Sequence, residues 1–281
     1  MKPKILITND DGVHARGIYN LYRAVKDIAD VVVVAPSSQK SATGQAASLN
    51  KPLKIHTIAT WPEDAKNIHS VNGTPADCVK LAISVILGGK PDMIVSGINR
   101  GSNAGRNVIN SGTVGGVIEG ILRGIPGIAF SCSDFEKQEF DDLESEIKKL
   151  VKYFIEHPPK RGSLFNVNFP DNIASNLKGI RMTKQGRGYW IDTPEKRMHP
   201  EGSPYYWLGG TWHDHEEETE SDVALLKEGY ATVVPLHIDQ MTDLTILESQ
   251  KNSFETLFNK KASVSTETLL NTESTVSEET P

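Results

Sequence analysis

The chain has 281 residues, a formal net charge of −6 at pH 7 and 38% hydrophobic residues. Its length predicts one large α/β domain with an appended extension, because small modules are far shorter. The acidic balance argues against a protein that binds a nucleic-acid polymer, since such proteins normally carry a basic surface.

The apolar segments predict neither membrane insertion nor export. No apolar run of 18 residues occurs, and the N-terminus leads directly into a strand-like segment without the features of a signal peptide. We therefore expect a cytoplasmic protein without membrane partners. Its two cysteines, Cys78 and Cys132, lie in apolar segments and are expected to be buried and reduced.

Short apolar runs alternate with helical patterns over residues 1–170. The strand-like runs cover residues 5–8, 31–34, 93–95, 128–130 and 164–167, and the helical patterns cover residues 18–28, 74–86, a stretch after 113, and 143–154. Thr74 is the predicted N-cap of the second helix, with Pro75 at its first position and Asp77 completing a capping box. Strands that are apolar on both faces predict a Rossmann-like, doubly wound and mainly parallel sheet.

The pattern changes after residue 170. Residues 171–250 are predicted to form a β-rich C-terminal extension, with hairpins that serve oligomer contacts and with a part that returns to the core. Its aromatic residues favour core or subunit contacts, with base stacking as the alternative; they are Tyr189, Trp190, Tyr205, Tyr206, Trp207 and Trp212. Residues 260–281 are predicted to be a disordered tail, because residues 262–281 hold nine Ser or Thr, four Glu and no Lys or Arg.

Three polar turns follow predicted strands. They cover residues 9–12, 37–44 and 96–105. In doubly wound sheets, ligands bind outside the carboxyl ends of the strands. We therefore expect these turns to converge on one site, although they are far apart in sequence.

The first turn contains two adjacent carboxylates, Asp10 and Asp11. Two neighbouring acids at a buried strand end repel each other unless a cation or hydrogen-bond donors satisfy them. Oxygen ligands favour a hard cation such as Mg²⁺, Mn²⁺ or Ca²⁺, and Ser41 and Asn99 add a hydroxyl and an amide oxygen. The alternative is a turn in which an aspartate merely caps the following helix.

A glycine-rich stretch follows, with seven glycines between Gly97 and Gly120. Within it, Ser111-Gly112-Thr113 directly precedes a helical pattern, and the N–H groups at a helix N-terminus suit a phosphate. We predict a phosphate site at Ser111, Gly112 and Thr113, with Asn99 and Asn103 as further contacts. The alternative is a flexible loop.

In this order and spacing, the motifs resemble the survival protein E family, the stationary-phase survival acid phosphatases. The resemblance spans residues 4–247 and rests on ILITNDDG at 5–12, VVVAPSSQKSATG at 32–44, VNGTPADCVKLA at 71–82, PDMIVSGINRGSNAG at 91–105, SGTVGGVIEG at 111–120, FNVNFP at 165–170 and SDVALLKEGYATVVPL at 221–236.

The resemblance implies a 5′-nucleotidase. Family members hydrolyse nucleoside 5′-monophosphates, often 3′-monophosphates and sometimes polyphosphate, with a divalent cation. It implies one Mg²⁺ or Mn²⁺ per subunit, held by Asp10, Asp11, Ser41 and Asn99, with the two aspartates as the catalytic residues. It also implies a phosphate cradle at residues 111–113 and a homodimer or homotetramer formed through the C-terminal extension.

One departure from the family pattern bears on base recognition. The family usually has Tyr before the Ser-Gly-Thr triplet and small Ala residues after it, whereas this chain has Asn110 before it and Gly115-Gly116-Val117 after it.

Two other classes place acids after a first strand. A haloacid-dehalogenase-like phosphatase with an Asp nucleophile needs Asp-x-Asp, whereas Asp10 and Asp11 are adjacent. A non-catalytic, Mg²⁺-binding regulatory module of the receiver type would be about half this length and would need a later phospho-accepting Asp. The second and third strands here end without an acid.

Overall fold

The computed structural model describes residues 2–62, 65–136, 140–171 and 177–258. Residues 1–238 form one compact unit and residues 239–281 a second, in which α7 (Leu244–Phe258) is the described element. The tail predicted to be disordered, residues 260–281, lies outside the described residues. Within the described ranges, no helix is long and apolar enough to cross a membrane. Both Cys78 and Cys132 are buried.

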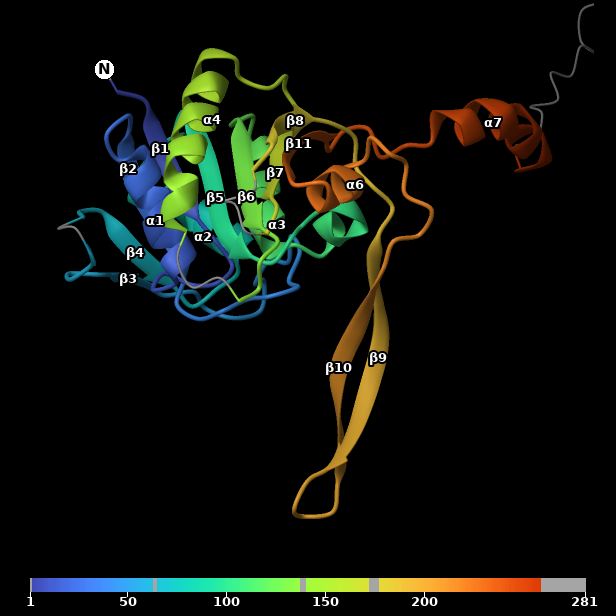
Figure 1. The fold of residues 1–281 in the computed structure, drawn as a ribbon, viewed down its shortest axis with the longest axis horizontal. Coiled ribbons are helices and arrows are strands. Elements are labelled where there is room, and N and C mark those ends of the chain that lie inside the picture. The colour runs from blue at the N-terminus through green and yellow to red at the C-terminus, as the bar shows by residue number, and fades with distance from the viewer. Residues whose placement is uncertain (1, 63–64, 137–139, 172–176, 259–281) are drawn as a thin grey trace, which may run out of the picture. The chain divides into compact units, whose positions relative to one another are not determined.

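A nine-stranded sheet forms the centre of the first unit, in the order β3-β4-β2-β1-β5-β6-β7-β11-β8 (Figure 1). Its strands are β1 (Lys4–Thr8), β2 (Asp30–Pro36), β3 (Ile55–Thr57), β4 (Ile68–Val71), β5 (Met93–Arg100), β6 (Gly127–Cys132), β7 (Ser163–Phe169), β8 (Gly179–Met182) and β11 (Tyr230–His237). The six strands from β4 to β7 in this order run parallel, while β3 and β11 pair antiparallel with β4 and β7. The predicted α/β fold with a mainly parallel sheet is confirmed.

Helices cover both faces of this sheet (Figure 1). The helical elements are α1 (Arg16–Val25), α2 (Pro75–Leu81), a π-helical turn η2 (Ala82–Ile86), a 3₁₀ turn η3 (Gly105–Ile109), α3 (Gly112–Ile121), a 3₁₀ turn η4 (Asp141–Leu143), α4 (Glu144–Glu156) and α6 (Asp222–Lys227). Successive strand side chains point to opposite faces. Ile5 and Ile7 of β1 accordingly belong to the same apolar cluster as Ile18 of α1, whereas Leu6 clusters with Val79 of α2.

The start of α2 matches its predicted capping box. Asp77 N–H donates to Thr74 Oγ1 at 3.1 Å, and Thr74 N–H donates to Asp77 Oδ2 at 2.9 Å. Two N–H groups without intrahelical partners are thereby satisfied, which fixes where the helix begins after β4.

The chain after residue 170 partly rejoins the sheet. Strand β11 pairs antiparallel with β7, and β8 runs parallel to β11 at the sheet edge. Between β8 and α6, strands β9 (Tyr189–Met198) and β10 (Pro204–His213) form a separate antiparallel ribbon. Its aromatic side chains do not form a core, because Trp190, Tyr206 and Trp207 are 44%, 58% and 60% exposed. The core alternative for this cluster is therefore wrong.

Candidate active site

The turn after β1 is held by its own asparagine. Gly12 N–H donates to Asn9 Oδ1 at 3.1 Å, and Asn9 Nδ2 donates to the Gly12 carbonyl at 2.9 Å. These two bonds close the turn without using the side chains of Asp10 and Asp11. Asp10 is only 5% exposed. The predicted acids therefore occupy a rigid turn at the carboxyl end of a central strand.

The loop after β2 is hydrogen-bonded to this turn and to the residue that ends η3, just before α3. Lys40 N–H donates to the Asp10 carbonyl at 2.7 Å, and Gly44 N–H donates to the Asn110 carbonyl at 3.0 Å. Ser41 lies between these two attachments. Gln39 Nε2 donates to Ser41 Oγ at 2.9 Å, which orients the hydroxyl and leaves it another lone pair.

The third contribution comes from the end of β5. This strand continues to Arg100, beyond its predicted apolar run, with a register shift against β6 between Ser96 and Asn99. Asn99 Nδ2 donates to the Gly101 carbonyl at 2.7 Å. Because the amide nitrogen is occupied in this way, the Asn99 Oδ1 atom is the one available to a cation.

Helix α3 begins against Asp10. Ser111 is its N-cap, and Ser111 Oγ accepts from Val114 N–H at 3.2 Å. A Cβ atom on Gly112 would lie 2.8 Å from Asp10 Cβ, so only glycine permits this close approach. The cap satisfies the Val114 N–H, and the N–H groups of Gly112 and Thr113 before it have no intrahelical partner and suit an anion.

Thr113 has a role that the sequence did not predict. Its side chain is fully buried, and its hydroxyl donates to Asp10 Oδ1. The Thr113 hydroxyl is therefore committed to the carboxylate, and only its backbone N–H remains for the predicted phosphate contact.

One cavity of about 570 Å³ brings most of the predicted residues together. Its lining includes Asp10, Asp11, Ser41, Asn99, Asn103 and Ser111. Gly112 and Thr113 do not line it; they are buried in the first turn of α3, beside Asp10. This volume lies within the usual range of small-molecule sites.

Asn103 is 7% exposed and belongs to a polar network at the cavity wall. Its Nδ2 donates to Ser131 Oγ at 2.7 Å, and its N–H donates to Asn168 Oδ1 at 2.8 Å. Asn166 Nδ2 donates to the Asn103 carbonyl at 2.9 Å. These bonds fix Asn103 and leave one of its two amide hydrogens for a ligand.

Burial dominates the electrostatics of the two acids. Desolvation raises the pKa of Asp10 to about 6; the Thr113 hydroxyl opposes this rise and the neighbouring Asp11 charge adds to it. Desolvation also raises the pKa of Asp11, against the opposing effects of the Arg100 backbone N–H and the Arg100 charge. Both carboxylates are therefore costly to ionise without a further positive charge.

The donor set fits a hard cation. Two carboxylates, the Ser41 hydroxyl and the Asn99 amide oxygen line the same cavity, and all are oxygen ligands of the kind that Mg²⁺ and Mn²⁺ prefer. No group of three His, Cys, Asp or Glu side chains suited to a metal occurs in the part of the chain that the structure describes. The chemistry thus fits a cation that keeps water or substrate oxygens among its ligands rather than a closed structural site.

Sequence patterns do not single out three cavity residues, Gln39, Arg100 and Phe135, of which Gln39 and Arg100 adjoin predicted ligands. They favour core or subunit contacts for Tyr189 and Trp190, with base stacking as the alternative, and both line the cavity together with Phe135. Phe135 follows the carboxyl end of β6, so the strand-end rule that selected the three polar turns also pointed to this segment.

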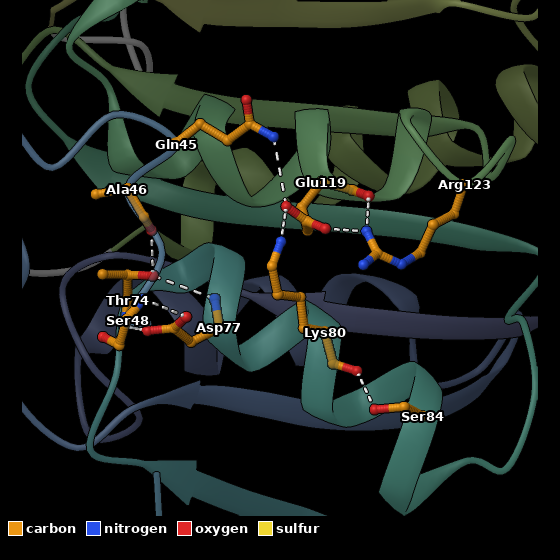
Figure 2. A network of polar contacts seen from close by, with 9 residues as sticks. All are labelled: Gln45, Ala46, Ser48, Thr74, Asp77, Lys80, Ser84, Glu119 and Arg123. Carbon is orange, nitrogen blue, oxygen red and sulfur yellow. Dashed lines mark hydrogen bonds and ion pairs between the residues drawn. The ribbon is translucent and has the colours of Figure 1, made fainter. Parts of the chain in front are cut away.

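A second polar network supports the loop that carries Ser41 (Figure 2). Asp77 Oδ1 accepts from Ser48 N–H at 2.9 Å, and Thr74 Oγ1 donates to the Ala46 carbonyl at 2.6 Å. The loop is thereby attached to the N-terminus of α2.

Glu119 of α3 extends this network. Its carboxylate is 2% exposed and pairs with Lys80 and Arg123, and Gln45 Nε2 approaches it at 3.4 Å (Figure 2). Each helix that flanks the loop therefore contributes a buried acid that fixes it.

Gly115 explains part of the departure from the small alanines expected after the triplet. A Cβ atom at this position would lie 2.1 Å from the Gly44 carbonyl oxygen. In this chain the loop lies directly on the helix backbone, and an alanine would separate the two.

Comparisons with known proteins relate the chain to one family. A family model described as Survival protein SurE matches residues 5–192. The 5′-nucleotidase SurE of Protochlamydia amoebophila is 48% identical over 259 residues, covering 92% of this chain and 99% of the relative. The 5′-nucleotidase SurE of Flavobacterium psychrophilum is 41% identical over 239 residues, covering 85% and 93%. The crystal structure of the SurE protein from Aquifex aeolicus matches with a TM-score of 0.77 at 35% identity, covering 90% of this chain and all of that one.

Proposed function

The chain belongs to the survival protein SurE family, and from this membership we propose that it is a divalent-cation-dependent phosphomonoesterase. Its proposed reaction is the hydrolysis of nucleoside 5′-monophosphates to a nucleoside and phosphate. Nucleoside 3′-monophosphates and polyphosphate are the further substrates to be tested.

One observation carries the proposal. Four oxygen donors from three strand ends, Asp10, Asp11, Ser41 and Asn99, line one cavity together with the N-cap of α3. A cation site and an anion-binding helix terminus beside each other are what a phosphate monoester requires.

The proposed chemistry assigns a task to each group. A divalent cation held by the four oxygen donors would neutralise phosphoryl oxygens and lower the pKa of a nearby water. The first N–H groups of α3 and the Ser111 hydroxyl bind the phosphoryl oxygens and stabilise their charge during transfer. The carboxylates of Asp10 and Asp11 orient the attacking water, and one of them accepts its proton. Thr113 keeps Asp10 in place.

Phosphate release tests the proposal directly. The substrates are a panel of 5′- and 3′-mononucleotides and polyphosphate, each assayed with Mg²⁺, with Mn²⁺ and with a chelator. Asp10→Asn and Asp11→Asn are expected to fall below about a tenth of wild-type turnover, because each removes a charged cation ligand. Asp27→Asn is the matched control, since the Asp27 side chain is 65% exposed and pairs with Lys148 instead.

The same experiment separates the alternatives. Turnover above a tenth of wild type in both cavity variants contradicts the ligand assignment. A covalent aspartyl-phosphate trapped with a labelled phosphate analogue supports a nucleophilic aspartate instead. Absence of phosphate release under every cation condition supports a regulatory role without turnover.

We further propose that the protein forms a homodimer or homotetramer through the β9–β10 ribbon. A two-stranded ribbon is marginally stable by itself, and this one exposes large apolar side chains. Met198, Tyr206, Trp207 and Leu208 are 58%, 58%, 60% and 80% exposed. Contact with another copy of the chain would cover them.

A further inference from the structure

The candidate active-site cavity contains aromatic rings that the proposed phosphoryl chemistry does not use. Phe135, Tyr189 and Trp190 line the same cavity as the two aspartates. Phe135 is 53% exposed and Trp190 is 44% exposed, so neither is a core residue. Their ring centroids lie 6.4 Å apart with an interplanar angle of 84°, so the two rings form a corner with accessible surface.

This corner begins close to the proposed cation site. A Cβ atom on Gly101 would lie 2.4 Å from Phe135 Cε1, which shows that the phenyl ring rests on the Gly101 backbone. The Gly101 carbonyl in turn accepts from the Asn99 side chain at 2.7 Å. Phe135 therefore contacts a residue that is hydrogen-bonded to the side chain of Asn99, a proposed cation ligand. This contact lies on the cavity side of the turn that ends β5.

A second aromatic ring and the hydrogen bonds of the preceding segment hold Trp190 in position. Its ring meets Trp212 edge to face, with centroids 6.0 Å apart. The segment before it is fixed by two further bonds, from Arg106 N–H to the Gly188 carbonyl at 2.9 Å and from Arg187 N–H to Glu217 Oε1 at 2.7 Å. The aromatic surface is thus organised before any ligand arrives, which lowers the entropy cost of binding.

We propose that Phe135 and Trp190 form the subsite for the nucleobase of the substrate, an inference that rests on the proposed nucleotidase function. A planar base stacks on the rings while the phosphate lies at the cation site and the α3 N-terminus. Asp192, which also lines the cavity, accepts hydrogen bonds from the ribose hydroxyls or the base N–H groups. Stacking on aromatic faces tolerates different bases, because every base presents a π-face.

The subsite distinguishes nucleotides from sugar phosphates that lack a base. The test compares AMP with ribose 5-phosphate in the full-length protein with its cation. Phe135→Ala and Trp190→Ala are each expected to raise KM for AMP about 5- to 100-fold, as for a lost base–aromatic stack. The kcat/KM for ribose 5-phosphate is expected to change less than about twofold, because that substrate never reaches the rings. Trp190→Phe is expected to retain most of the wild-type KM.

A control and a second measurement make the result decisive. Tyr153→Ala removes an aromatic ring that is 51% exposed on α4 and absent from the cavity lining, and it is expected to match wild type with both substrates. Adenosine binding, measured by calorimetry, requires no turnover. Its affinity is expected to fall about 5- to 100-fold in the two alanine variants.

Failure of the subsite and failure of the proposed function give different results. Equal losses on AMP and ribose 5-phosphate, or adenosine affinity unchanged in both alanine variants, overturn the base subsite and leave the phosphatase proposal standing. Absence of cation-dependent phosphate release from both substrates overturns the proposed function, and adenosine titration then still decides whether the aromatic corner binds a nucleoside.

Discussion

Thr113 donates a hydrogen bond from its fully buried hydroxyl to Asp10 Oδ1, and so links the first turn of α3 to the end of β1. A hydrogen-bond donor to one oxygen of a carboxylate ligand fixes which of its two oxygens faces the cation. We therefore expect Thr113→Val, which keeps the shape and removes the donor, to lower kcat or cation affinity about 10- to 100-fold. Cation titration of phosphate release measures both quantities.

Thr113→Ser provides the comparison for this link. It restores the hydroxyl and removes only a methyl group, so we expect it to remain within about threefold of wild type. If Thr113→Val binds the cation and turns over as well as Thr113→Ser, Asp10 does not depend on this hydrogen bond.

The buried Asp10 carboxyl predicts an unusual pH dependence for the metal-free protein. Its pKa rises from 3.8 to about 6, so the neutral form is favoured in the folded state. Asp10 therefore contributes stability that is fully present below pH 3.8 and is lost as the pH rises through about 6. The loss amounts to about 3 kcal/mol in the free energy of unfolding.

Chelator-treated wild type and Asp10→Asn, unfolded with denaturant between about pH 4 and pH 7, isolate this effect. The asparagine variant cannot ionise, so its stability relative to wild type is expected to increase across this range. Adding Mg²⁺ at high pH is expected to stabilise wild type more than the variant, because the ion binds the ionised carboxylate. A pH-independent difference between the two proteins would show that Asp10 titrates normally.

From the contacts of Asp77 we predict that loss of its carboxylate from the capping box weakens cation binding. Its carboxylate accepts from Thr74 N–H and from Ser48 N–H, and the Ser48 bond holds the loop that continues back to Ser41 (Figure 2). Asp77→Ala is expected to cost about 2 kcal/mol in the free energy of unfolding, from a lost cap and an unsatisfied buried donor. It is also expected to weaken cation binding several-fold, because the loop loses one of its attachments.

Ser84→Ala is the control from the same network. The Ser84 hydroxyl bonds the Lys80 carbonyl on the exposed side of η2, away from the loop. Its removal is expected to change stability by less than about 0.5 kcal/mol and to leave cation affinity unchanged. Unchanged affinity in Asp77→Ala as well would mean that other contacts suffice to hold Ser41.

The sheet could be predicted from the sequence because its strands are short runs that are apolar on both faces. Ile5, Leu6 and Ile7 are all fully buried, which is what a parallel sheet covered on both faces requires. The place of β11 between β7 and β8, however, depends on a return of the chain from beyond residue 170. Part of residues 171–250 is predicted from the sequence to return to the core, but sequence periodicity identifies a strand and not its neighbours, so the position of β11 in the strand order could not be predicted.

The candidate site was predictable to the extent that strand ends determine it. Asp10 and Ser41 follow β1 and β2, and Asn99 lies in the last residues of β5, so all three are at carboxyl ends that share one edge of the sheet. The Thr113–Asp10 bond and the position of Phe135 against Gly101 depend instead on side-chain directions in loops and helix starts. No spacing rule in the sequence encodes those contacts.

From the exposed apolar side chains of the β9–β10 ribbon we predict that the protein forms an oligomer. Trp207 and Leu208 are 60% and 80% exposed, and an apolar surface of this kind is stabilised when another subunit covers it. Replacing both with Ser is expected to reduce the oligomer to smaller species, as measured by light scattering coupled to size-exclusion chromatography. Tyr153→Ser on α4 is expected to keep the wild-type mass.

Because the ribbon also carries Trp190, loss of the oligomer is expected to raise KM for AMP more than for ribose 5-phosphate. A monomeric wild-type protein, or a double variant of unchanged mass, would assign the exposed ribbon another role.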